Sequence, residues 1–85
     1  SVRYFAEKVF LSPNYFGDMV RKQTGKTASE YIQTKIIERA KENLLSSDKT
    51  TSQVALVLGF LYPQHLSRMF KRIVGCTPNE FRTRN

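Results

Sequence analysis

Apolar residues recur along this chain with the spacing of amphipathic helices. No segment of the sequence shows the sustained period-two alternation of a half-buried strand. The pattern predicts helices over residues 2–9, 13–24, 28–46, 51–58 and 63–74, followed by a short helix near the C-terminal end. The expected fold class is therefore all-α, with about six helices.

The chain also repeats itself, because residues 13–31 align with residues 63–81 at an offset of fifty. Five aligned pairs are identical: Pro13/Pro63, Met19/Met69, Gly25/Gly75, Thr27/Thr77 and Glu30/Glu80. The prolines suit the first position of a helix, the glycines suit its left-handed end, and each Thr–Glu pair has the spacing of a capping box. Two copies of one unit suggest one task that is done twice along an extended partner.

In the second copy, residues 63–74 separate an apolar stripe from a polar face. The stripe consists of Leu66, Met69, Phe70 and Ile73. The opposite face carries Gln64, Ser67, Arg68 and Lys71. Gln can pair with adenine, Arg with guanine and Ser with several base edges. Any exposed helix face is polar, but this one falls on the second helix of a predicted helix-turn-helix, at the turns that usually contact bases. That position favours base contact.

In the first copy, the corresponding helix places Phe16, Met19 and Val20 inward. Its outer positions are Asn14, Gly17, Asp18 and Arg21. Asn14 is a candidate reader of adenine. Gly17 lowers helix propensity by about 1 kcal/mol relative to alanine, so it is either a tolerated defect or a place where DNA comes close. Asp18 could accept a hydrogen bond from cytosine N4, or it could pair with Arg21 or Lys22, and both interpretations stay open.

Fourteen Lys and Arg residues against seven Asp and Glu residues give a formal net charge of +7. This balance favours a polyanionic partner, although an anionic membrane surface would attract the same charge. A membrane role is disfavoured, because the basic helices need their apolar stripes for the core and no apolar run approaches the roughly 20 residues of a membrane span. Residues near helix ends or behind the polar faces are candidates for contacting about five to seven DNA phosphates. These candidates are Arg21, Lys22, Lys26, Thr27, Thr51, Ser52, Lys71 and Arg72.

Catalytic chemistry is not expected from this sequence. His65 is the only histidine, and we find no cluster with the spacing of metal ligands, so we predict no enzyme, no catalytic residue, no metal and no cofactor. His65 would be a surface residue or a phosphate contact. Cys76 stands alone, so no intrachain disulfide is possible, which suits a reducing cytoplasm. The alternative function is a helical protein–protein interaction module without specific DNA readout.

Several short motifs carry a family resemblance. In the second half they are Val54-Ala55, Gly59-Phe60, SRMFKR at residues 67–72, Gly75, Thr77-Pro78 and Phe81-Arg82. In the first half they are LSPNYFGDMVRKQTG at residues 11–25 and TASEYI at residues 27–32, followed by ERAKENLL at residues 38–45. Together these segments resemble the DNA-binding domain of the AraC/XylS family of bacterial transcription regulators.

The resemblance implies a single domain over residues 1–85, in which a linker helix (28–46) joins a first helix-turn-helix (1–27) to a second (50–85). By family position, base contacts fall on Pro13, Asn14, Gly17 and Asp18 in the first copy and on Gln64, Ser67 and Arg68 in the second. The implied partners are double-stranded DNA and a sensor or effector domain outside this chain, with RNA polymerase as a further candidate and the cytoplasm as location.

The linker helix sets the expected geometry. About 19 residues give a strut of roughly 28 Å, and successive major-groove faces on one side of DNA lie about 34 Å apart. The two recognition helices, near residues 13–24 and 63–74, could then read adjacent major-groove segments.

Four features depart from the family pattern. The helix that usually precedes the one starting at Val2 is absent from this chain, and we expect the chain to be part of a longer protein. Asp18 stands where a basic or polar residue is common. Leu61 occupies a turn position that is usually acidic or polar, and Leu66 replaces the usual aromatic residue.

Overall fold

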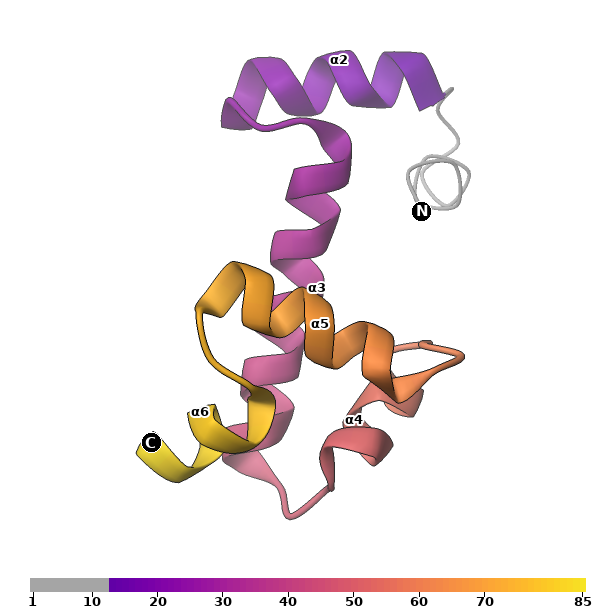
Figure 1. Cartoon of the computed structure of the whole chain (residues 1–85). Helices are drawn as coiled ribbons and strands as arrows, with labels where there is room; N and C mark the ends of the chain where they lie inside the picture. Colours follow the sequence, from indigo (N-terminus) through magenta and orange to yellow (C-terminus); the bar gives the residue numbers. More distant parts are fainter. Residues whose placement is uncertain (1–12) are drawn as a thin grey trace. The chain divides into compact units, whose positions relative to one another are not determined.

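The computed structural model describes the backbone of residues 13–85 and the side chains from Asp18 onward, and it contains five helices (Figure 1). They are α2 (Pro13–Thr24), α3 (Ala28–Ser46), α4 (Thr51–Val57), α5 (Pro63–Val74) and α6 (Pro78–Arg84). No strand occurs within residues 13–85, so the all-α prediction is confirmed. The helix expected over residues 2–9 lies outside the described residues. In the part of the chain that is described, no helix has the length and apolar character needed to cross a membrane.

Two compact units divide the chain, Ser1–Lys35 and Ile36–Asn85, and the boundary between them falls within α3. The described part of the first unit contains α2 and the first turns of α3. The second unit contains the rest of α3 together with α4, α5 and α6. The helix α3 has the bounds predicted for the long helix, whereas the division into subdomains at residues 27 and 50 stays a prediction.

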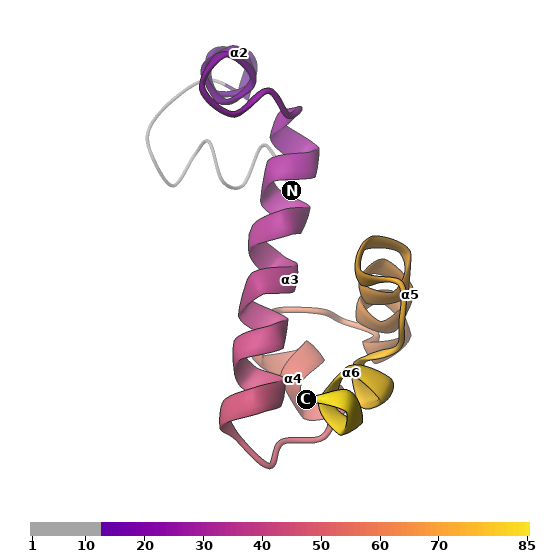
Figure 2. The same ribbon diagram turned by 90° about the vertical axis from the view of Figure 1, so that its left-hand side faces the viewer.

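The second unit has a continuous apolar core. The cluster of buried residues comprises Ile37, Ala40, Leu44, Val54, Ala55, Leu66 and Phe70. These residues come from α3, α4 and α5. Figure 2 shows α4, α5 and α6 gathered around the C-terminal half of α3. Phe81 brings α6 into the cluster, because its ring meets the ring of Phe70 edge-on with 5.5 Å between centroids. Burial of these side chains is what fixes the orientation of α5.

One residue of the predicted apolar stripe is not in the core. Ile73 is 40% exposed, whereas Leu66 and Phe70 are fully buried. Val74 is half-buried and packs against the core instead. Because Val74 follows Phe70 by four residues, it supplies the contact of the last turn, and Ile73 turns towards solvent. The prediction that Ile73 belongs to the buried stripe is therefore wrong.

The internal repeat is visible in the hydrogen bonds of two capping boxes. Thr27 N–H donates to Glu30 Oε1 (3.2 Å) and Glu30 N–H donates to Thr27 Oγ1 (3.1 Å). In the second copy, Thr77 N–H donates to Glu80 Oε1 (2.9 Å) and Glu80 N–H donates to Thr77 Oγ1 (3.1 Å). The glycine two residues before each box has a positive φ, 75° in the first copy and 96° in the second. The repeat thus ends one helix and starts the next by the same chemistry twice.

These boxes also lower the pKa of two carboxyl groups. Hydrogen bonding to the side chain and backbone of Thr27 lowers the pKa of Glu30. Hydrogen bonding to the backbone and side chain of Thr77 lowers the pKa of Glu80 in the same way. The lowered pKa extends the ionised form of both carboxyl groups to lower pH, and that form suits the positive end of a helix dipole.

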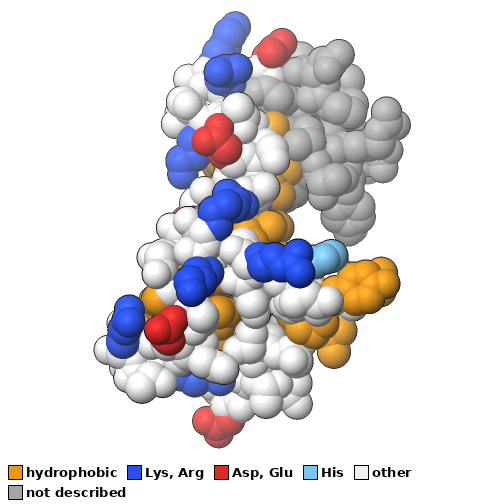
Figure 3. Space-filling model, viewed as in Figure 1, with side chains coloured by type: hydrophobic (Ala, Val, Ile, Leu, Met, Phe, Trp, Pro, Cys, Tyr) orange, Lys and Arg blue, Asp and Glu red, His pale blue; other side chains and the backbone are white. Residues whose placement is uncertain are grey.

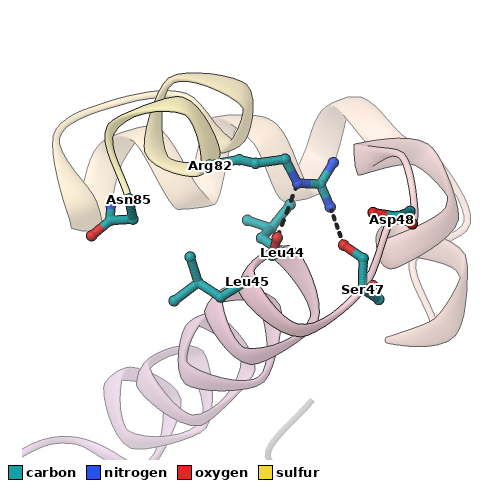
Figure 4. A pocket seen from close by; sticks show the side chains of 6 residues that line it. All are labelled: Leu44, Leu45, Ser47, Asp48, Arg82 and Asn85. Atoms are coloured by element: carbon teal, nitrogen blue, oxygen red, sulfur yellow. Dashed lines mark hydrogen bonds between the residues drawn. The ribbon is translucent and has the colours of Figure 1, made fainter.

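Arg82 ties α6 to the end of α3 (Figure 4). Its Nε donates to the carbonyl oxygen of Leu44 at 2.9 Å, and its Nη2 donates to the carbonyl oxygens of Ser47 (3.4 Å) and Lys49. Carbonyl groups at the end of a helix lack intrahelical partners, so one guanidinium group satisfies several of them together. A shallow pocket surrounds this contact, and it is lined by Leu44, Leu45, Ser47, Asp48, Arg82 and Asn85.

Replacing Arg82 with alanine is expected to lower the free energy of unfolding by about 2 kcal/mol, because charge-assisted hydrogen bonds to partly buried carbonyls are lost. Chemical denaturation followed by circular dichroism measures this change. Arg84→Ala is the matched control. Its side chain is 65% exposed and faces Glu80 at 3.7 Å, so the expected change is below about 0.5 kcal/mol. Equal effects of the two substitutions would contradict a tying role for Arg82.

Candidate nucleic-acid interface

The candidate interface is built on α5, whose two ends are set by local sequence. Pro63 is the first helical residue, and its fixed φ suits that position. At the other end, Gly75 adopts φ 96° and its N–H donates to the carbonyl oxygen of Lys71 at 2.9 Å. Between these ends, full burial of Leu66 and Phe70 turns the opposite side of α5 towards solvent.

The exposed side of α5 is cationic and rich in hydrogen-bonding groups. Its exposed polar side chains are Gln64, His65, Arg68, Lys71 and Arg72. The sequence of α5 contains no acidic residue. Lys and Arg side chains are visible on this face of the second unit in Figure 3. We call these five residues the α5 face, and its chemistry matches base edges and phosphates at once.

The residues predicted to contact bases in the second copy lie on or beside this face. Gln64 and Arg68 are exposed and four residues apart, so their side chains lie on the same side of the helix. Ser67 is half-buried and lies at the edge of the face. Exposure is consistent with the predicted roles, which remain predictions.

In the first unit, α2 begins at Pro13 as predicted. Asn14 and Gly17 lie in this helix, but side chains before Asp18 are outside the described residues. Asp18, Arg21 and Lys22 are all exposed. Val20, on the other side of the helix, is 5% exposed, so α2 also has a buried and a polar side.

The predicted phosphate contacts near helix starts differ in availability. Ser52 is exposed in the first turn of α4. Lys26 is exposed, and its Nζ lies 3.3 Å from Thr34 Oγ1. Thr27 and Thr51 are half-buried. Their hydroxyls already take part in hydrogen bonds, the first in the capping box and the second as donor to Asn79 Oδ1 at 3.0 Å. Ser52 and Lys26 are therefore the better placed of the four.

His65 lies on the exposed side of α5, in agreement with its prediction as a surface residue. It is exposed on the first turn of α5 beside Gln64, and its ring stands edge-on to the ring of Tyr62 with 5.4 Å between centroids. Its helical position next to Gln64 and three residues before Arg68 explains this exposure, because the three residues share one side of the helix. Among the described residues, no group of three or more His, Cys, Asp or Glu side chains could hold a metal ion.

The fold and the α5 face define a helix-turn-helix domain, with α4 and α5 as its two helices. Residues 5–84 of the chain match a family of helix-turn-helix domains of the AraC type. Similar proteins include regulators of the AraC/XylS family. The chain belongs to this family, so the resemblance drawn from the sequence is confirmed.

Two relatives and one solved structure show the range of similarity. The chain is 33% identical over 78 residues to the transcriptional regulatory protein YesN of Bacillus subtilis (strain 168), covering 89% of the chain but only 21% of YesN. It is 32% identical over 79 residues to the regulatory protein SoxS of Salmonella typhimurium (strain LT2), covering 93% of the chain and 74% of SoxS. The DNA-binding domain of the global transcriptional factor AdpA, solved with a target DNA, is 28% identical and matches with a TM-score of 0.84 over 98% of the chain and 75% of the AdpA chain.

Proposed function

We propose that this chain binds double-stranded DNA sequence-specifically as the DNA-binding part of a bacterial transcription regulator. The observation that carries the proposal is the α5 face, exposed and cationic on the helix whose other side is fully buried at Leu66 and Phe70. The similarity to the AdpA domain, which was solved in complex with DNA, supports it. In a helix-turn-helix, the second helix enters the major groove with its N-terminal turns against the bases.

The chemistry of the face suggests a role for each side chain. Gln64 would pair with adenine, Arg68 with guanine O6 and N7, and Ser67 with a neighbouring base edge. Lys71 and Arg72, in the last turn of α5, would contact phosphates.

The first unit would read a second block of sequence with α2. Pro13, Asn14, Gly17 and Asp18 are the proposed base contacts there, and Arg21, Lys22 and Lys26 the proposed phosphate contacts. The helix α3 has 19 residues, which gives a length of roughly 28 Å. That length is close to the spacing of about 34 Å between successive major-groove faces, so one chain could serve two adjacent segments.

Further partners follow from the length of the relatives. The chain spans 21% of YesN, so most of that regulator lies outside the matched region. We propose that a sensor or effector domain accompanies this chain in the same way. RNA polymerase is the further partner that a transcription regulator in the cytoplasm would meet.

A protein–protein interaction module is the second candidate function. Large apolar side chains exposed in the second unit favour it, namely Leu56 (62%), Val57 (59%) and Leu61 (79%). Leu56 and Val57 are consecutive on α4, and exposed apolar groups that lie together can mark a protein interface. The two functions differ in what they require of Arg68.

Replacing Arg68 with alanine is expected to weaken binding to a selected target duplex by about 10- to 100-fold, the usual contribution of one bidentate arginine–guanine contact. Fluorescence anisotropy with a labelled duplex measures the dissociation constant. Arg84→Ala removes the same charge from α6 and is expected to change affinity less than about twofold, since the residue lies outside the α5 face. Unchanged DNA binding in Arg68→Ala would favour the interaction module.

A further inference from the structure

An apolar corner lies directly before the α5 face. Leu61 is 79% exposed, the highest value among the large hydrophobic side chains of the described residues, and Tyr62 is 51% exposed. They immediately precede Pro63, the first residue of α5. Single exposed apolar residues are ordinary on protein surfaces. Leu61 and Tyr62, however, follow one another at the N-terminal end of α5, next to Gln64, the first proposed base contact of that helix.

The backbone around this corner is held on both sides. Phe60 N–H donates to the carbonyl oxygen of Ala55 at 2.9 Å, and the Phe60 side chain packs against the core. On the other side, His65 N–H donates to the carbonyl oxygen of Tyr62 at 3.0 Å, and the two rings are in edge-on contact. The corner is therefore anchored at fixed points rather than carried on a free loop.

The corner is also continuous with the α5 face. Figure 3 shows exposed hydrophobic side chains directly beside the histidine, with Lys or Arg side chains on its other side. Any partner that covers Gln64 and His65 comes close to Tyr62, whose ring contacts that of His65, and Leu61 is the neighbour of Tyr62 in the chain. The charge of the adjoining face selects a polyanion as that partner.

Only one apolar group is displayed in the major groove of DNA, the 5-methyl group of thymine. Phosphates would select cationic or hydrogen-bonding side chains, and leucine offers neither. We propose that Leu61 packs against a thymine methyl group at the edge of the block read by α5. This inference rests on the proposed function, and it adds an apolar specificity determinant to the polar readers.

The test removes that methyl group from the DNA. A duplex carrying the selected site is compared with duplexes in which single thymines are replaced by deoxyuridine, which pairs identically but lacks the 5-methyl group. For the unaltered protein, one replacement at the edge of the α5 block should weaken binding about fourfold, the effect of exposing one buried methyl group. For Leu61→Ala, the thymine and deoxyuridine duplexes should bind equally.

Leu56→Ala is the matched control, because Leu56 is also a largely exposed leucine, 62% exposed, but lies on α4. It should keep the fourfold preference for thymine. Leu61 is too exposed for its truncation to unfold the chain, and thermal denaturation verifies this for both variants.

Three outcomes overturn the inference. In the first, the unaltered protein selects a site but no thymine replacement changes its affinity. In the second, Leu61→Ala keeps the preference. In the third, Leu61→Ala leaves DNA binding unchanged and removes binding to another protein, which would assign the corner to that partner. Failure to select any site would instead overturn the proposed function itself.

Discussion

Replacing Phe70 with alanine is expected to lower the free energy of unfolding of the second unit by about 3–5 kcal/mol. The Phe70 side chain is fully buried and its ring contacts Phe81, so truncation removes apolar burial and leaves a cavity between α5 and α6. Domains of this size are stable by only a few kcal/mol, so the variant should be largely unfolded near 37 °C. Urea denaturation followed by circular dichroism measures the loss.

Ile73→Ala provides the control on the same helix. Ile73 is 40% exposed, so its truncation should cost less than about 1 kcal/mol. A loss as large as that of Phe70→Ala would mean that Ile73 belongs to the core after all. The burial pattern of α5, and with it the orientation of the α5 face, would then be contradicted.

DNA affinity is expected to fall roughly a thousandfold when monovalent salt rises from about 50 to 200 mM. If about six of the candidate phosphate contacts are made, the log–log slope of affinity against salt should lie near −5. The exposed cations at the ends of α2 and α5 supply much of this, among them Arg21, Lys22 and Lys71. Anisotropy titrations at four or five salt concentrations give the slope.

Lys71→Ala should reduce the magnitude of the slope by about 0.9, with a nearly uniform loss of affinity across duplex sequences. Lys41→Ala removes the same charge from α3, where the ammonium group lies 5.6 Å from the Phe81 ring, and should leave the slope unchanged. A slope near zero for the unaltered protein would contradict an interface built on phosphate contacts.

Helix bounds could be predicted from the sequence because they depend on neighbours in the chain. Prolines at helix starts, glycines of positive φ and Thr–Glu capping boxes act within four residues. The helices α2 and α5 therefore begin and end where these signals stand, and α3 begins at its capping box. The fate of Ile73 depends on which helices pack against the last turn of α5, and periodicity alone cannot supply that.

Contacts between residues far apart in the chain could not be predicted from the sequence patterns. Arg82 reaches carbonyl groups that precede it by 33 to 38 residues, and Thr51 donates to Asn79 on another helix. The sequence marked Arg82 only as part of a family motif and Thr51 only as a phosphate contact. The hydrogen bonds of Arg82 and Thr51 depend on the packing of α6 against α3 and α4, which is a property of the folded unit.

Part of the candidate site could be predicted from the sequence, because it depends on helical phase and not on distant contacts. Exposure of Gln64 and Arg68 follows from helical phase once Leu66 and Phe70 are assigned to the core. His65 shares that exposed side, as expected of a surface residue on a polar helix face. Asp18 is exposed, and its two alternative roles, a base contact and an ion pair with Arg21 or Lys22, stay predictions.

Selection from a pool of randomised duplexes tests the central claim most directly, with the unaltered chain and Arg68→Ala side by side. Reading by both units predicts an enriched motif of two blocks whose centres lie about 10 base pairs apart, one helical turn. Arg68→Ala should lose sequence preference in one block and keep it in the other. Salt-sensitive binding without any enriched motif would contradict the claim and leave a basic domain that associates with DNA through its charge alone.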